Sequence, residues 1–200
     1  MKKTIIFCML LALCSSLFAQ NKEYHFANAF TIKVSDKMEL KNPDDLYSHY
    51  TGSSNNGTII FQQKGLSKMS QSAFQTYCRI MMKCFDDTNG ELPSVGDDWT
   101  DYFDSSDLYD FEQAAYDELA PPQKMVSKPE ASFVKTQNFQ CIKVQYVRTG
   151  DKGNVTVRIY YFFNRYKAVK MITSYRNSDG YIWADVVDEA FKSFKWDKIY

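Results

Sequence analysis

Aspartate residues recur at every third position in an acidic stretch that runs from residue 97 to 118. Carboxylate oxygens that converge on one point are the ligands that Ca²⁺ prefers. On an α-helix a spacing of three residues drifts by about 60° per step, so only neighbouring members of the repeat could share an ion. The order also lacks the central Gly and terminal Glu of a helix–loop–helix calcium loop. The Ca²⁺ candidates are Asp98, Asp101, Asp104 and Asp107.

The same repeat has a second interpretation, which is a solvated acidic face with Asp97 or Asp98 at the N-terminus of a helix. Nine acidic and no basic residues lie between positions 97 and 118. Aromatic residues share this stretch and could contact a partner. The candidates for such an interaction surface are Trp99, Tyr102 and Phe103.

The opposite charge prevails after this stretch, since residues 119–200 contain 14 basic and 7 acidic residues. Cations interleaved with tyrosines can bind polyanions or stack on sugars and bases. The same pattern arises when long cations lie at the margin of an ordinary sheet, or when they pair with the acidic stretch. The residues are Arg158, Arg165, Lys167, Lys170 and Arg176, interleaved with Tyr160, Tyr166 and Tyr175.

The sequence contains no recognised catalytic motif. Its two histidines, His25 and His49, lie near the start of the chain and in a polar segment, where we expect both to be solvated. There is no Gly-x-Ser-x-Gly elbow, phosphate-binding glycine loop, His-Glu-x-x-His helix or Cys-x-x-Cys pair. The chain is therefore not expected to be an enzyme or to need a cofactor, apart from the Ca²⁺ alternative. A hydrolase without these motifs would need a cleft with a carboxyl group of raised pKa.

The first twenty residues are typical of a secretory signal peptide. Lys2 and Lys3 precede an apolar run over residues 5–13, and small residues lead to Ala19, after which we expect cleavage. The apolar run is too short for a permanent membrane anchor, so the mature chain is expected to have no transmembrane segment. The sequence thus predicts a periplasmic or secreted protein.

Lipoprotein anchoring at Cys14 is disfavoured because Leu13, rather than a small residue, precedes this cysteine. Residues 20–200 have the size of one ordinary domain. Without Lys2 and Lys3 the chain has 22 basic and 24 acidic residues, a net charge of −2. This balance and the predicted export argue against a nucleic-acid partner.

Three cysteines remain after removal of the leader, namely Cys78, Cys84 and Cys141. If Cys78 and Cys84 share a helix, they lie about 9 Å apart along its axis and on different faces, which disfavours a disulfide. Either could pair with Cys141, but buried free thiols are the preferred interpretation, because cysteine is often a core residue.

Periodicity predicts both strands and helices. Residues 30–34, 58–63, 132–135, 139–148, 155–163 and 166–175 are expected to be strands, with a short turn at Asn164-Arg165. Helices are expected from Ser67 or Ser70 to Cys84, over residues 99–119 in one or two pieces, and over residues 181–194. The first helix is indicated by Met69, Ala73, Tyr77, Ile80, Met81 and Cys84.

The last two strands predict the arrangement of layers. Pairing across their turn places two apolar sets on opposite faces: one contains Val157, Ile159, Tyr161, Phe163, Ala168 and Ile172, and the other contains Tyr160, Phe162, Val169 and Met171. Because both faces are apolar, both need covers. The expected fold class is α+β, with an antiparallel sheet covered by helices on both faces.

The order of these elements resembles that of the PsbP/Mog1-like family. The resemblance rests on the early strand at 30–34, the strand at 58–63 followed by a helix, the meander over 139–175 and a last helix that ends in Ala190-Phe191-Lys192-Ser193-Phe194-Lys195-Trp196. It implies a single α/β/α sandwich over residues 20–200. Members of this family are mostly non-enzymatic, and the resemblance transfers no specific partner or binding residue to this chain.

The leading hypothesis is therefore a monomeric, non-catalytic binding module of the bacterial cell envelope, whose partner is a protein or another envelope component. The alternative is a small-ligand or Ca²⁺-responsive protein that uses residues 97–118, with a pocket between that segment and the sheet.

Overall fold

The computed structural model describes residues 21–26, 29–41, 58–87 and 89–200. The expected signal peptide, Cys14 and His49 lie outside these ranges. No helix within them is both long and apolar enough to cross a membrane. The strands are β1 (Asn21–Phe26), β2 (Phe30–Ser35), β3 (Met38–Leu40), β4 (Ile59–Gln63), β5 (Cys78–Asp86), β6 (Glu130–Lys135), β7 (Gln140–Arg148), β8 (Val155–Asn164), β9 (Lys167–Arg176) and β10 (Lys195–Trp196). The helices are η1 (Ala73–Gln75), η2 (Trp99–Asp101), α3 (Ser105–Asp117), η3 (Asn177–Asp179) and α4 (Gly180–Lys192).

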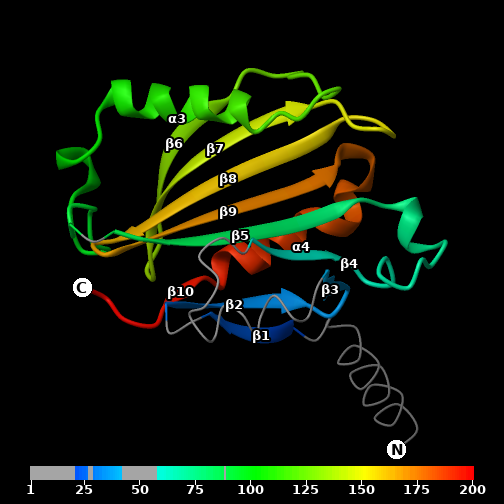
Figure 1. Ribbon diagram of the computed structural model, residues 1–200, viewed down its shortest axis with the longest axis horizontal. Helices are drawn as coiled ribbons and strands as arrows, with labels where there is room; N and C mark the ends of the chain where they lie inside the picture. Colours follow the sequence, from blue (N-terminus) through cyan, green and yellow to red (C-terminus); the bar gives the residue numbers. More distant parts are fainter. Residues whose placement is uncertain (1–20, 27–28, 42–57, 88) are drawn as a thin grey trace, which may run out of the picture.

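Seven strands form the main sheet in the order β3-β4-β5-β9-β8-β7-β6, and every neighbouring pair is antiparallel (Figure 1). A second, three-stranded sheet has the order β1-β2-β10. It joins the two ends of the described chain, since Phe30 on β2 pairs with Trp196 on β10.

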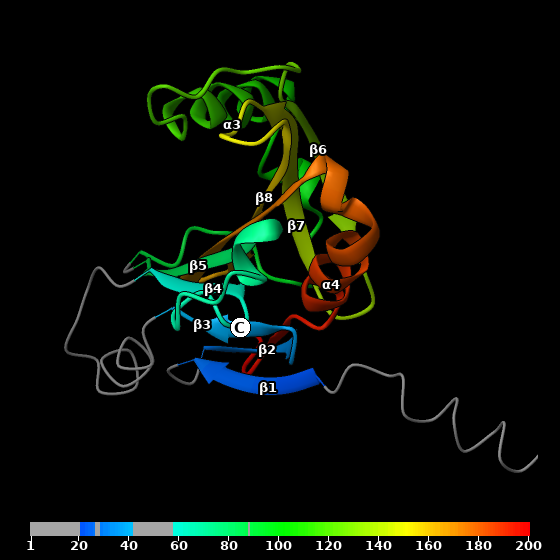
Figure 2. The ribbon, with the colours of Figure 1, turned by 90° about the vertical axis from the view of Figure 1, so that its right-hand side faces the viewer.

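The two faces of the main sheet carry the apolar sets that the sequence predicts. One face contributes Tyr160, Phe162, Val169 and Met171 to a core that also contains residues of α4 and β2. The opposite face contributes Val157 and Ile159 to a cluster with Ala115 of α3. Figure 2 shows α4 against the first face, with the small sheet beyond it.

The expected sandwich with helices on both faces is not confirmed in full. The first face is covered by α4 together with the small sheet. On the other face, α3 packs beside β6 and β7. Within the described residues, no helix covers that face where it continues over β4 and β5 (Figures 1 and 2). The supported description is an antiparallel, sheet-rich α+β fold with two α-helices.

The helix expected between Ser67 and Cys84 is wrong. This segment is a turn, the short η1 helix and then β5, which lies in the sheet between β4 and β9. Cys78, Ile80 and Met82 are buried at alternate positions, so the strand period decides the structure. The apolar spacing that matched a helix also contained this alternation.

The other predicted elements are confirmed with small shifts of their ends. The helical stretch at 99–119 is η2 followed by α3, and the last helix is α4. The turn between β8 and β9 is confirmed, with Arg165 in the left-handed region at φ 53°. The sequence analysis missed β1, β3 and β10, because the apolar alternation in them is short or weak.

Closely packed aromatic rings, in stacked and edge-to-face pairs, fill the core beneath α4. The ring centroids of Phe162 and Phe194 lie 3.9 Å apart, and those of Phe139 and Phe162 lie 5.2 Å apart. Phe191 of α4 joins them at 5.2 Å from Phe139. Because Phe139, Phe162 and Phe194 are fully buried, they fix α4 on the sheet.

We predict that Phe162→Ala lowers the free energy of unfolding by about 3–5 kcal/mol, because it removes a buried ring and leaves a cavity. Urea unfolding followed by circular dichroism measures this change. The control is Tyr109→Ala, which truncates a half-exposed ring on α3 and should change the free energy by about 0.5 kcal/mol or less. Equal losses in the two variants would contradict the assigned core.

Candidate functional site

A cleft of about 360 Å³ opens at one end of the main sheet, and four of its lining side chains are cationic. Arg79 comes from β5, Arg148 from the end of β7, Lys152 from the β7–β8 hairpin and Arg176 from the end of β9. We call this cavity the basic cleft. Its walls also include aromatic and apolar side chains, among them Leu66, Phe74, Tyr77 and Val155.

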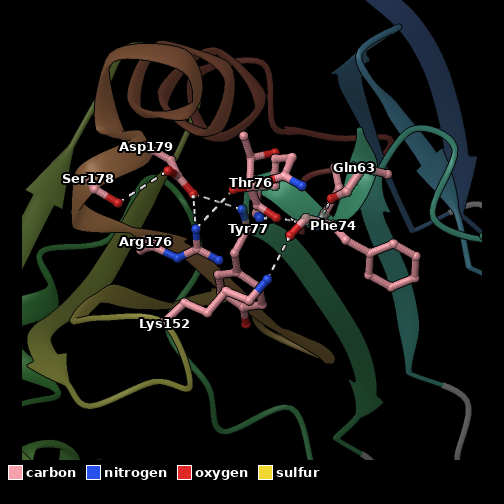
Figure 3. Close-up of polar contacts among 11 residues, drawn as sticks. Gln63, Phe74, Thr76, Tyr77, Lys152, Arg176, Ser178 and Asp179 are labelled. Carbon is pink, nitrogen blue, oxygen red and sulfur yellow. Dashed lines mark hydrogen bonds and ion pairs between the residues drawn. The ribbon is translucent and has the colours of Figure 1, made fainter. Parts of the chain in front are cut away.

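Asp179 joins three elements behind the basic cleft (Figure 3). Its buried carboxylate accepts a hydrogen bond from the backbone N–H of Tyr77 at 2.9 Å and lies 3.3 Å from Arg176 Nη1. The Ser178 hydroxyl donates to its other oxygen at 3.2 Å. These contacts join the start of β5, the end of β9 and the start of α4, so Asp179 fixes the direction of Arg176.

The other cations have neutral partners. Lys152 Nζ donates to the carbonyl oxygen of Phe74 at 3.3 Å, and Arg148 Nη1 donates to that of Thr149 at 2.9 Å. The Arg79 guanidinium lies 5.9 Å from the centre of the Tyr77 ring. Among the described residues, Arg176 is the cation of the cleft that has a carboxylate within ion-pair distance. The cleft therefore has an excess of positive charge.

The β7–β8 hairpin forms one wall of the basic cleft, and glycine is needed there. A Cβ on Gly150 would lie 2.8 Å from the Val155 side chain, and Gly153 has a φ of +113°. The hairpin is tied to the start of η3 by the Asn177 N–H, which donates to the Asn154 carbonyl at 2.9 Å. Lys152 is thus held on a short, closely packed loop.

The opposite wall is the β4–β5 connection, residues 64–77. Gln63 holds its end, because its side-chain amide donates to the carbonyls of Ala73 at 3.1 Å and Thr76 at 2.7 Å. Arg176 Nη1 also donates to the carbonyl of Gln75 at 3.0 Å. Phe74 and Tyr77 are positioned by this connection.

Glu39 fixes the start of the same connection. Its carboxylate accepts hydrogen bonds from the backbone N–H groups of Ser67 at 2.7 Å and Gly65 at 2.9 Å. Burial by itself would raise the pKa of Glu39, but hydrogen bonds from Ser67, Gly65 and Gln62 outweigh it and lower the pKa to about 2.

The arrangement is suited to holding an anion. Arginine and lysine donate charge-assisted hydrogen bonds to phosphate and carboxylate groups. The described lining contains neither histidine nor cysteine. Tyr77, the tyrosine of the lining, shares its hydroxyl with Ser174 at 3.1 Å. The sequence analysis found Arg176 but missed Arg79, Arg148 and Lys152. Arg148 and Lys152 share the β7–β8 hairpin, and the strand order brings them together with the distant Arg79 and Arg176.

The predicted Ca²⁺ candidates are placed at helix ends. Asp98 caps η2 and accepts from the Thr100 N–H at 3.1 Å. Asp104 caps α3 and accepts from the N–H of Asp107 at 3.1 Å, while the Asp107 carboxylate accepts from the Asp104 N–H at 2.8 Å. This reciprocal pair is a capping box.

No group of three or more His, Cys, Asp or Glu side chains that could hold a metal ion occurs among the described residues. Asp101 lies in η2, near Asp98 in the chain. The pKa of Asp97 is lowered, mainly by the Ser94 N–H, and that of Asp98 is lowered by the Thr100 hydroxyl and N–H. The Ca²⁺ hypothesis stays a prediction, and the helix caps already account for Asp98, Asp104 and Asp107.

The three aromatic interaction candidates have different environments. Trp99 is only 2% exposed, and its indole N–H donates to the Ser94 carbonyl at 2.9 Å. Phe103 packs against Phe163 with centroids 5.5 Å apart. Only Tyr102, at 43% exposure, offers a large part of its ring to a partner. In this conformation Trp99 and Phe103 are packing residues, because they cover the β8 end of the sheet.

Most of the predicted basic residues are paired within the chain. Lys170 pairs with Glu118, Arg158 with Asp188, and Lys167 Nζ lies 2.6 Å from Asp86. The Lys170–Glu118 pair joins the acidic stretch to the sheet. In this one pair, a predicted basic residue contacts the acidic stretch, as one of the interpretations of the sequence expects.

A second cavity, of about 320 Å³, lies beside β5 and β9, and Glu118 is the one residue of the segment 97–118 in its described lining. Met81, Phe85 and Ile172 line it, together with the paired Glu118 and Lys170. Glu118 is the one carboxylate of its described lining, so the cavity lacks the converging carboxylates of a Ca²⁺ site.

Cys78, Cys84 and Cys141 are free thiols, as preferred from the sequence. Cys78 and Cys141 are buried, and this burial raises the pKa of both thiols and makes them poor nucleophiles. His25 is largely exposed, with its Nδ1 2.9 Å from Thr31 Oγ1 and its Nε2 3.2 Å from a Glu23 oxygen.

Comparison with known proteins identifies the fold. No family model and no curated protein sequence matches the chain. Cyanobacterial PsbP (CyanoP) from Synechocystis sp. PCC 6803 matches in structure with a TM-score of 0.51 and 13% identity, over 92% of this chain and 94% of its own. LpqN, involved in cell envelope biogenesis of Mycobacterium tuberculosis, matches with a TM-score of 0.50 and 9% identity, over 91% and 93%.

A structure from Bacteroides thetaiotaomicron VPI-5482 covers 90% of this chain with a TM-score of 0.50 and 10% identity. This chain spans only 49% of that protein's length. At such identities the likeness concerns the fold alone. The chain has the PsbP/Mog1-like fold that the order of its elements predicts.

We predict that Glu39→Gln destabilises the protein most near neutral pH. The folded pKa of about 2 lies below the ordinary value of 4.5, so the ionised carboxylate contributes stability above about pH 4.5 and loses it as the pH falls towards 2. Urea unfolding over this range should show a difference between wild type and variant that shrinks on acidification. A difference independent of pH would contradict this role of Glu39.

We predict that Asp104→Ala lowers the free energy of unfolding by about 1 kcal/mol, because α3 loses its N-cap. Thermal unfolding should show the same loss in EDTA and in millimolar Ca²⁺. Asp101→Ala is the control, since within the described residues its side chain caps no helix. A Ca²⁺-dependent rise in melting temperature that Asp104→Ala abolishes would instead support the ion-binding hypothesis.

Proposed function

We propose that this chain is an exported, non-catalytic binding module of the bacterial cell envelope, and that it holds an anionic group of its ligand in the basic cleft. The observation that carries the proposal is the convergence of Arg79, Arg148, Lys152 and Arg176 on one cavity, in which only Arg176 is paired with a described carboxylate. Cations kept this close repel one another, and a bound anion relieves that repulsion.

Preorganisation of the basic cleft supports a binding role. Asp179 and the Gln75 carbonyl hold Arg176, and the Phe74 carbonyl holds Lys152, so the cations are positioned before a ligand arrives. Less conformational entropy is then lost on binding. Phe74 and Tyr77 add ring surface beside the charges, which suits a ligand with both an anionic group and an apolar or sugar part.

The absence of catalysis is part of the proposal. A hydrolase of the kind considered from the sequence would use a carboxyl group of raised pKa. Among the described residues, the carboxyl groups whose pKa is shifted are Glu39, Asp97 and Asp98, and all three are shifted downwards. None of the three lines the basic cleft.

The envelope location rests on two supports. The first twenty residues have the pattern of an export signal. LpqN, which shares the fold, is involved in cell envelope biogenesis in its own organism. The alternative function is that of a small-ligand or Ca²⁺-responsive protein that uses residues 97–118, and the second cavity beside Glu118 would support the small-ligand form of it.

We predict that inorganic pyrophosphate, used as an anionic probe, binds in the basic cleft. In a ¹⁵N-labelled sample, titration should shift the amide signals of residues 149–154 and of Tyr77. The double variant Arg148→Gln/Lys152→Gln should weaken the affinity by at least about tenfold, since each charge-assisted hydrogen bond contributes more than 1 kcal/mol.

The matched control is Lys135→Gln/Lys195→Gln, which removes the same charge at residues on β6 and β10 that do not line the cleft. It should leave the affinity within about twofold, because exposed charges far from a site are screened by salt. Equal weakening by both double variants would show that pyrophosphate senses only the overall charge, and would reject the basic cleft as a site.

A further inference from the structure

The basic cleft belongs to a larger cationic end of the molecule. The connections 64–77, 123–126, 149–154 and 177–179 all meet at the end of the main sheet that lies on the right in Figure 1 and faces the viewer in Figure 2. We call this surface the loop end. It carries seven basic side chains, which are Lys64, Lys68, Arg79, Lys124, Arg148, Lys152 and Arg176.

Few carboxylates oppose these charges. Asp179 is buried and pairs with Arg176, and the Glu39 carboxylate accepts hydrogen bonds from the N–H groups of Gly65 and Ser67. Asp151 is the acidic residue of the cleft lining. The loop end is therefore positively charged although the whole chain is not.

Large apolar side chains are exposed on the same surface. Met69 is 73% exposed at the tip of the β4–β5 connection, and Phe74, at 40%, lies on the rim of the basic cleft. Val126 is half exposed beside the end of β7, where its N–H donates to the Val147 carbonyl at 2.7 Å. Met69 has a φ of 55°, a conformation that is uncommon for methionine and that turns the chain at this tip.

We infer that the loop end docks on a membrane surface that carries anionic phospholipid headgroups. This inference rests on the proposed function and names the source of the anion: a headgroup phosphate enters the basic cleft while Met69 and Phe74 enter the interfacial layer. Lysine and arginine close to an anionic leaflet each strengthen binding roughly fivefold. Exposed apolar side chains among cations are the usual composition of an interfacial contact.

The distribution of charged and apolar side chains on the loop end favours a membrane surface over a protein as its partner. Lys64, Lys68 and Lys124 lie on connections beside the four cations of the basic cleft, so the charge extends beyond that cleft, which suits a planar array of phosphates. The apolar residues stand singly among the cations, so each can enter the headgroup layer without a matching pocket. Lys64 and Lys68 lie on either side of the turn that precedes Met69 and bring charge to the same tip.

The test is cosedimentation of the purified protein with sucrose-loaded vesicles. Vesicles of phosphatidylglycerol and phosphatidylcholine in equal parts should bind the protein at least about tenfold more tightly than pure phosphatidylcholine, and NaCl at about 0.5 M should abolish the difference. Met69→Asn/Phe74→Asn and, separately, Arg148→Gln/Lys152→Gln should each weaken binding at least about fivefold. Asparagine tolerates the positive φ at position 69, so Met69→Asn keeps the turn.

The control is Tyr109→Asn/Ile199→Asn, which removes two exposed apolar side chains outside the loop end. It should bind vesicles like the wild type. Equal binding to both kinds of vesicle, or equal losses in the control, would overturn the inference. If pyrophosphate binds the basic cleft but the vesicles do not bind, membrane docking is rejected and the proposed function stands. If neither binds, both are rejected.

Discussion

The end of the main sheet that bears the basic cleft depends on one buried carboxylate. Asp179 accepts a hydrogen bond from the Tyr77 N–H and pairs with Arg176, so a single side chain joins β5, β9 and the start of α4. A buried carboxylate is tolerated only when its charge is balanced and its oxygens accept hydrogen bonds, and both conditions hold here. Removal of Asp179 would leave Arg176 without its carboxylate partner and would remove one of the contacts that hold the β4–β5 connection.

Stability and binding are assigned to different parts of the molecule. The face under α4 is aromatic and closely packed, and it supplies stability through rings such as Phe139, Phe162 and Phe194. The connections at the loop end are polar, cationic and held by hydrogen bonds to backbone carbonyls. A rigid sheet thus carries a site composed of side chains from several connections, a common arrangement for binding proteins.

Much of the fold could be predicted from the sequence, but little of the candidate site. The alternation in residues 155–175 predicted both faces of the sheet, because a hairpin register is fixed by its turn. The helix predicted before Cys84 is wrong, because the apolar residues of this segment fit both the helical and the strand period. Its pairing between β4 and β9 determines that it is a strand. Arg79, Arg148 and Lys152 have no local pattern in common. Arg148 and Lys152 share one hairpin, but their convergence with Arg79 follows from the strand order, which no short stretch of sequence contains. The aspartate repeat, by contrast, is visible in the sequence because its members are close together in the chain. Asp98, Asp104 and Asp107 take part in capping helices.

The small sheet has a consequence for how the chain matures. Strands β1 and β2 are synthesised first, yet β2 completes its pairing with β10, and the Thr31 hydroxyl donates to Asp197, 166 residues later in the chain, at 2.8 Å. Until β10 is synthesised, the hairpin of β1 and β2 therefore has one unpaired edge, on β2. Contacts of such long sequence separation form slowly, because a large loop must close first. The small sheet can therefore be completed only after β10 has been synthesised and has left the ribosome.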